Sequence, residues 1–313
     1  MNTLISKLQK SLVPLAAGAA MACAGVANAA AVVGFDVTGT GTFGTVSFDL
    51  LTDSTDTTLA TNFSGLVGSL GTQLAQTTVT ELRNGGVAVT PIGINVNNNA
   101  LGYEITKVLR LNETLLTNTL ALDGSRTVTF GNASQAGTDV DSAHAGEQQL
   151  AIYFDRLVDG TAANPNNVSC YGPLPTGGAN CAGGTAAGLL DGVLIASAHL
   201  ISNVSSFTVS PTPGIGTGSV DLRFVFDYIN PLYLRIAPGT VLTERATGTL
   251  NQPTFYNPTV MWDGTTLAGA GKQAFKFDSS ESFLTQAVPE PGSLALVGLA
   301  LAALSLGRRR RTR

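Results

Sequence analysis

One short acidic segment holds the side chains best suited to bind a metal ion. Asp139, Asp141 and Glu147 supply carboxylate oxygens, and His144 adds a ring nitrogen between them. Calcium prefers oxygen ligands and accepts the irregular backbone of a loop. The three carboxylates are therefore the candidate calcium ligands of this chain. The segment lacks the spacing of an EF-hand, and a solvated acidic loop is the alternative interpretation.

Three aromatic residues near the C-terminal end of the chain form a second candidate site. Phe255 and Tyr256 precede Trp262, which is the single tryptophan of the sequence. Exposed rings in a loop could stack on sugar rings, which predicts a glycan-binding surface. The same three rings could instead pack as an apolar cap over one end of the fold.

The sequence contains no recognised catalytic motif, and the two aspartates of one expected strand do not have the spacing of a glycosidase pair. Asp221 and Asp227 lie on one expected strand, six residues apart, which is roughly 20 Å at about 3.3 Å per residue. A glycosidase needs two carboxyl groups about 5 to 10 Å apart, and no GxSxG, HExxH or phosphate-binding loop motif occurs. We predict a non-enzymatic protein without a cofactor other than the candidate calcium. A carbohydrate-active enzyme is the distant alternative.

Two further polar residues have expected structural roles. His199 shares a strand face with Ile195 and Ile201, which predicts a packed imidazole. Arg223 follows Asp221 on the same expected strand, and we expect the two to form a surface ion pair worth less than about 1 kcal/mol.

Two cysteines predict a disulfide bond. Cys170 and Cys181 flank a loop rich in proline, glycine and asparagine, and Cys23 lies in the N-terminal export signal described below. An exported chain meets an oxidising compartment. A bond between Cys170 and Cys181 would contribute roughly 3 kcal/mol in the chain-entropy model.

The elements that must position these residues are strands. Apolar and polar residues alternate from Ser219 to Ile229, and the alternation is also clear from Leu150 to Val158. A period of two is typical of half-buried strands. Further strands are expected at Val32–Val37, Thr45–Leu51, Thr77–Leu82, Gly86–Thr90, Tyr103–Leu111, Thr114–Leu122, Arg126–Phe130, Val193–Ile201, Ser206–Ser210, Thr240–Arg245 and Gln273–Asp278.

Many short strands with threonine-rich surfaces indicate an all-β fold. Asp123-Gly124 separates two of the expected strands closely enough to form a hairpin. No long segment between the two ends of the chain has the 3.6-residue period of a helix. We predict an antiparallel β-sandwich in residues 30–287, with a jelly roll as one possible arrangement.

The N-terminus has the pattern of a signal peptide. Lys7 and Lys10 precede an apolar stretch from Leu12 to Val26, and small residues follow at Ala27 and Ala29. Signal peptidase cleaves after such a pair, so residues 1–29 are predicted to be removed, leaving Ala30 as the first residue.

The C-terminus, residues 288–313, combines three segments in a fixed order. A proline-containing motif is followed by an apolar run from Ser293 to Leu306 and by a cluster of arginines; the residues of the motif and the cluster are Val288, Pro289, Glu290, Pro291, Arg308, Arg309, Arg310 and Arg311. The run of 14 residues would span roughly 21 Å as a helix, against a hydrocarbon core of about 30 Å. The arginines would stay on the cytoplasmic side. We therefore expect a short transmembrane helix that dwells only transiently in the inner membrane.

This order of motif, apolar run and arginine cluster resembles the PEP-CTERM sorting signal of Gram-negative bacteria. The resemblance implies recognition by an exosortase and a link to exopolysaccharide and to biofilm or floc matrix. Segments of the second half, among them Gln149–Asp155, Leu190–Ser197 and Gln273–Phe283, also resemble the flocculation-associated PEP-CTERM proteins. That resemblance implies an extracellular matrix protein and transfers no catalytic residue.

Charge completes the functional prediction. Of the 17 basic and 21 acidic residues, seven basic and one acidic lie in the two terminal segments, which leaves a net charge of −10 on residues 30–287. This sign disfavours nucleic acid as a partner. We predict an exported cell-surface or matrix protein that promotes aggregation with exopolysaccharide, with exosortase and signal peptidase as processing partners. A carbohydrate-binding module is the alternative.

Overall fold

The computed structural model describes residues 31–44, 46–53, 56–89, 94, 103–144, 146–156, 190, 192–211, 216–250, 261–266 and 269–285. Residues 30–284 form one unit of the chain, and the fold below is the fold of that unit. Every regular element that it describes is a strand, so the predicted all-β, antiparallel class is confirmed. None of the described residues belongs to a helix long and apolar enough to cross a membrane.

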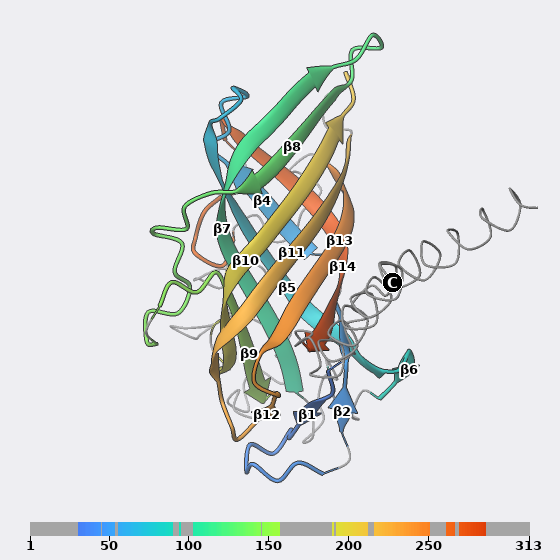
Figure 1. Cartoon of the computed structure of the whole chain (residues 1–313), viewed down its shortest axis with the longest axis vertical. Coiled ribbons are helices and arrows are strands. Elements are labelled where there is room, and N and C mark those ends of the chain that lie inside the picture. The colour runs from blue at the N-terminus through green and yellow to red at the C-terminus, as the bar shows by residue number, and fades with distance from the viewer. Residues whose placement is uncertain are drawn as a thin grey trace, which may run out of the picture. The chain divides into compact units, whose positions relative to one another are not determined.

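The strands differ widely in length, and the longest form the body of the sheet (Figure 1). In chain order they are β1 (Val33–Phe35), β2 (Ser47–Phe48), β3 (Leu50–Asp53), β4 (Asp56–Thr61), β5 (Leu70–Asn84), β6 (Val87–Ala88), β7 (Tyr103–Leu120), β8 (Arg126–Asn132), β9 (Leu150–Arg156), β10 (Val193–Val209), β11 (Gly216–Ile229), β12 (Leu234–Arg235), β13 (Thr240–Leu250) and β14 (Lys272–Thr285).

The main sheet closes on itself. Around the ring the strands follow the order β5, β4, β14, β13, β11, β10, β8 and β7, and β7 then pairs again with β5. Figure 1 shows β10, β11 and β13 running side by side, with β4 and β5 on the far side of the sheet. Facing parts of this closed sheet contribute to one core, as the two layers of the predicted sandwich would. A separate small sheet pairs β1 with β2 and β12.

Closure gives each long strand an inner and an outer face, and apolar residues occupy both. The inner face carries the main core, in which Leu109, Leu111 and Phe224 are almost fully buried. A smaller cluster lies on the outer face, where Trp262 and Met261 cover Leu74 and Val108. Successive residues of β5 and β7 are therefore buried in turn, one in the main core on the inner face and the next in the smaller cluster on the outer face.

Several expected strands merge or change. The two strands expected at Tyr103–Leu111 and Thr114–Leu122 are one strand, β7, whose polar Asn112 and Glu113 stay within the ladder. The strands expected around Val193 and Ser206 likewise form β10. Strand β4 was not predicted, because its threonines give no apolar alternation. The hairpin at Asp123-Gly124 is confirmed: it joins β7 to β8, and Gly124 has φ 84°.

Candidate functional site

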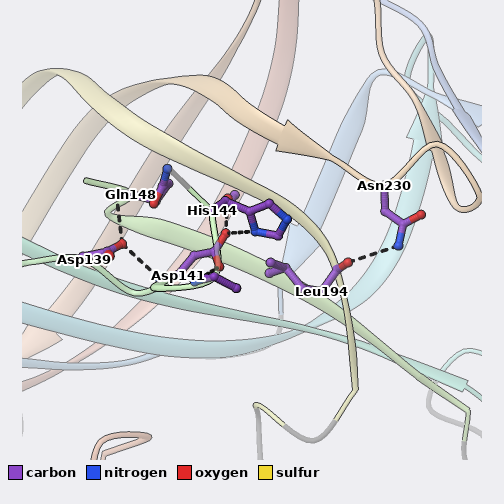
Figure 2. A network of polar contacts seen from close by, with 8 residues as sticks. Asp139, Asp141, His144, Gln148, Leu194 and Asn230 are labelled. Atoms are coloured by element: carbon purple, nitrogen blue, oxygen red, sulfur yellow. Dashed lines mark hydrogen bonds and ion pairs between the residues drawn. The ribbon is translucent and has the colours of Figure 1, made fainter. Parts of the chain in front are cut away.

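The segment predicted to bind calcium is held by hydrogen bonds within the protein (Figure 2). Asp139 Oδ1 accepts the backbone N–H groups of Asp141 at 3.0 Å and Gln148 at 3.2 Å. Asp141 Oδ1 accepts the N–H of Ala143 at 3.2 Å, whereas the side chain of Glu147 is exposed. Among the described residues, no group of three or more His, Cys, Asp or Glu is placed to hold a metal ion. Calcium binding remains a prediction, and it would have to replace these hydrogen bonds.

Asp141 also joins a serine and a histidine. Its Oδ2 accepts the Ser197 hydroxyl at 2.7 Å and lies 2.7 Å from Nδ1 of His144, whose ring stacks on Tyr228 with 3.6 Å between centroids. In a catalytic triad the histidine lies between serine and aspartate; here the aspartate lies in the middle, so His144 does not activate Ser197. Burial and the charge of Asp141 raise the pKa of Tyr153 to about 12. The arrangement anchors the loop to β10 and β11.

Trp262 packs against the sheet. Its side chain belongs to the outer cluster with Leu74 and Val108 and is only 8% exposed. The guanidinium of Arg110 lies 4.9 Å above the ring, and it also contacts Asp263 at 2.6 Å. The cation over the ring and the low exposure of the side chain leave little of Trp262 accessible for stacking on a sugar in this conformation.

Two expected side-chain contacts differ from the structure. His199 is not packed inside but lies on the outer face of β10, where Nδ1 is 2.8 Å from Asp227 Oδ1. Its position follows from the register shift between Leu194 and Ala196 of β10, which changes the face on which later residues of the strand point. Asp221 pairs with Arg245 at 3.1 Å rather than with Arg223, because Arg245 lies directly opposite on β13.

A buried charged cluster was not predicted. Lys107 Nζ contacts Asp53 at 2.5 Å, Glu281 at a shorter distance and Glu244 at 3.5 Å. The four side chains come from β7, β3, β14 and β13, and each is at most 6% exposed. Burial raises the pKa of Glu281 well above its ordinary value, and the Asp53 carboxylate raises it further against the lowering effect of Lys107. The same burial raises the pKa of Glu244.

One sequence signal could have revealed this cluster. Lys107 and Glu113 fall in the same alternation as the inward residues Ile105, Leu109 and Leu111. A charged residue in phase with an apolar face points inward and needs a partner there. The alternation predicts burial of these two residues but says nothing of which carboxylates from distant strands will meet Lys107.

Asp36 organises the loop after β1. Its carboxylate accepts hydrogen bonds from the backbone N–H groups of Thr38, Thr40 and Thr42 and from the hydroxyls of Thr38 and Thr40, at 2.6 to 3.0 Å. Burial by itself would raise the pKa of Asp36, but these hydrogen bonds outweigh it and lower the pKa to about 2. This carboxylate therefore has a structural role, with its acceptor capacity used within the loop.

The remaining predicted site residues lie outside the described residues. They are the signal cleavage residues Ala27, Ala29 and Ala30, the cysteines Cys170 and Cys181, the aromatic residues Phe255 and Tyr256, and the C-terminal motif with its arginines. The disulfide, the cleavage site and the short transmembrane helix stay predictions.

Comparison with known proteins assigns the C-terminal segment. Residues 287–311 match the family model of the PEP-CTERM protein-sorting motif. No curated protein and no solved structure is significantly similar to the chain. The matched residues contain the motif, apolar run and arginines that carried the resemblance in the sequence, and they imply that exosortase sorts the chain to the cell surface or beyond. The chain therefore carries a PEP-CTERM protein-sorting motif at residues 287–311.

Proposed function

We propose that this protein is a non-catalytic component of the cell surface or extracellular matrix that promotes aggregation, floc or biofilm formation by contact with exopolysaccharide. The observation that carries the proposal is the sorting motif at residues 287–311, which implies export and handling by exosortase. The acidic balance of residues 30–287 favours a partner that is neutral or reached through cations.

The outer face of the sheet offers a surface of suitable chemistry. Hydroxyl residues lie opposite one another across neighbouring strands, and all of them are exposed or half-exposed. One row contains Thr119, Thr127, Thr208 and Thr217, and the next contains Thr117, Thr129, Ser206, Ser219 and Thr247. Neighbouring strands are about 4.8 Å apart, so the hydroxyls repeat at that spacing, in the first row from β7 through β8 and β10 to β11 and in the second row as far as β13.

These hydroxyl rows suit a polymer that is itself rich in hydroxyl groups. Thr117 and Thr129 are 2.6 Å apart at their hydroxyl oxygens, and Thr127 and Thr208 are 3.1 Å apart. Each hydroxyl has one donor and two acceptor sites, so capacity remains after these cross-strand bonds form. A neutral polysaccharide lying across the strands could exchange hydrogen bonds with successive residues. Trp262 takes no part, because it packs beneath Arg110.

Sorting is tested by removing the signal. We expect full-length chain to reach the surface or matrix in a host with exosortase, and a chain lacking residues 288–313 to be lost from that fraction. A host without exosortase should give the same loss with the full-length chain. Equal amounts of both forms at the surface would contradict the sorting step, and unchanged cell aggregation after the loss would contradict the aggregation role.

Contact with polysaccharide is tested on the hydroxyl rows. The triple variant Thr129→Ala, Ser206→Ala and Ser219→Ala removes hydroxyls from β8, β10 and β11. We expect it to reduce co-sedimentation of the protein with purified host exopolysaccharide severalfold. Thr80→Ala, an exposed threonine of β5 outside the rows, is the control and should bind normally. Normal binding by a folded triple variant would exclude this surface.

A further inference from the structure

The closed sheet contains a cavity at the end where β7 meets β8. Its volume is about 440 Å³, and its walls come mainly from the apolar side chains of Phe63, Leu115, Val128, Phe130 and Phe207. Ligand pockets in proteins commonly measure about 300 to 1,000 Å³ and are mostly apolar. Size and lining both fit a small molecule.

Two buried polar side chains interrupt this apolar lining. Glu113 on β7 is 1% exposed, and one of its oxygens, Oε1, accepts hydrogen bonds from Asn203 Nδ2 at 2.7 Å and Ser205 Oγ at 2.8 Å. Gln73 on β5 is 4% exposed, and its Oε1 accepts no hydrogen bond from the described residues. Gly71 lies directly opposite Glu113, so Gln73 is the diagonal neighbour of Glu113 on the inner face.

The unsatisfied oxygen of Gln73 requires a physical explanation. A buried acceptor without a partner loses its bonds to water and gains nothing in return. A ligand that donates a hydrogen bond inside the cavity would supply the missing partner. Burial also raises the pKa of Glu113 above its ordinary value, against the lowering effect of Asn203 and Ser205, which favours a neutral polar partner over an anion.

The cavity reaches the surface. Gly65, Gly124 and Arg126 line it and are exposed, and Asn118 ties the rim together by donating to the Gly65 carbonyl at 2.6 Å and accepting from Arg126 at 2.8 Å. Apolar side chains beside this rim are also exposed: Leu66, Val67, Leu120 and Leu122. An apolar molecule would thus meet apolar surface before it enters.

We propose that this cavity binds a small, largely apolar molecule that carries one hydrogen-bond-donating group, with Gln73 as the acceptor and Glu113 beside it. The apolar body fills the space between the phenylalanines, and the donor group, a hydroxyl or an amine, reaches the inner polar wall. This binding activity is separate from polysaccharide contact, because the hydroxyl rows lie on the opposite face of the same strands.

The test uses three compounds of similar size and calorimetric titration of the full-length protein. The hydroxyl compound 1-naphthol has a donor, 1-naphthylamine presents an amine, and 1-methoxynaphthalene has no donor. We expect 1-naphthol or 1-naphthylamine to bind at one site about tenfold more tightly than 1-methoxynaphthalene. The stronger of the two identifies the ligand as an alcohol or an amine. Absence of saturable binding, or equal binding of all three, would overturn the proposal.

Variants separate the cavity from other surfaces. Gln73→Leu removes the acceptor at similar volume and should reduce the affinity for the donor compound to that of 1-methoxynaphthalene. Ala60→Trp places a large ring in the lining and should abolish binding of all three compounds. Thr80→Leu, an exposed position of the same strand as Gln73, should change nothing. Circular dichroism establishes that each variant is folded, and undiminished binding by a folded Ala60→Trp variant would exclude this cavity.

Discussion

Lys107 is the one cation in a cluster with three buried carboxyl groups, and this imbalance determines its effect on stability. Desolvation of a charge costs several kcal/mol, which only close opposite charges and hydrogen bonds offset. Burial raises the pKa values of Glu244 and Glu281, so protonation of these carboxyls becomes easier and would reduce the imbalance. None of the four residues lines the large cavity, so the cluster acts in the core.

Removal of this cation should destabilise the protein strongly. We expect Lys107→Met to lower the free energy of unfolding by about 3 to 5 kcal/mol, because Asp53 would remain buried without its nearest cation. Urea unfolding followed by circular dichroism measures the change. Arg245→Met removes the cation of an exposed pair and should cost less than about 1 kcal/mol. Similar losses in the two variants would show that burial of Lys107 does not matter.

For single residues, the sequence predicts which side chains are buried but not which side chains they pair with. The alternation around Leu109 places Lys107 on the inner face, yet Glu281 is 174 positions away in the chain and meets it only through strand pairing. Asp221 shows the same limit, since proximity in sequence favoured Arg223 whereas the ladder gave Arg245. Which side chains meet across two strands depends on the register of their pairing, and the sequence of one strand does not specify that register.

At the scale of single strands, the structure differs from the sequence-based expectation in strand length and in the position of bulges. Strands β7 and β10 each run through positions at which the residue pattern suggested an interruption, because a closed sheet offers pairing partners along their whole length. Bulges then shift the faces: the shift between Leu115 and Thr117 leaves Leu116 exposed, and Gly131 beside it leaves room for that side chain. The alternation of apolar and polar residues therefore predicts a strand but does not show where a bulge shifts its register.

Gly71 on β5 allows an aromatic ring to pack directly on the strand. A Cβ at this position would lie 2.1 Å from the ring of Phe63, so Gly71→Ala must displace Phe63 from the cavity wall. We expect a loss of about 1 to 3 kcal/mol in the free energy of unfolding. Gly44→Ala is the matched control, since nothing lies within 4 Å of its Cβ position. Thermal unfolding compares the two, and an equal effect would show that Phe63 moves without cost.

Closure of the sheet is the decisive property of the unit formed by residues 30–284. The pairing of β5 with β7 joins the two ends of the strand order and creates an enclosed inner face. That face holds the phenylalanine core, the Lys107 cluster and the cavity, while the outer face holds the hydroxyl rows and the Trp262 cluster. The same strands thus present two surfaces of opposite character.

Stability of the whole molecule should pass through a maximum in mildly acidic solution. The pKa of Asp36 is lowered to about 2, below its unfolded value of about 3.9, so its contribution is lost as pH falls through this window. The pKa values of Glu113, Glu244 and Glu281 are raised above about 4.3, so their contribution is present at lower pH and is lost as pH rises toward their folded values.

Urea unfolding between pH 2 and 8 tests this expectation. Asp36→Asn should flatten the acidic side of the curve, and Glu113→Gln should reduce the decline on the other side, since neither replacement titrates. A wild-type stability that does not decline at any pH above about 4.3, the ordinary glutamate pKa, would contradict the raised carboxyl pKa values.

The sequence by itself determined the C-terminal sorting motif and the all-β class, because the motif depends on residue order within one short segment and the class on the alternation along single strands. Alternation also determined which residues of β7 point inward. The tertiary structure decided that the sheet closes, which carboxyls surround Lys107, that Trp262 packs under Arg110, and that Gln73 and Glu113 share a cavity. These features need contacts between strands far apart in the chain, and their physical basis is register and closure, which no single segment specifies.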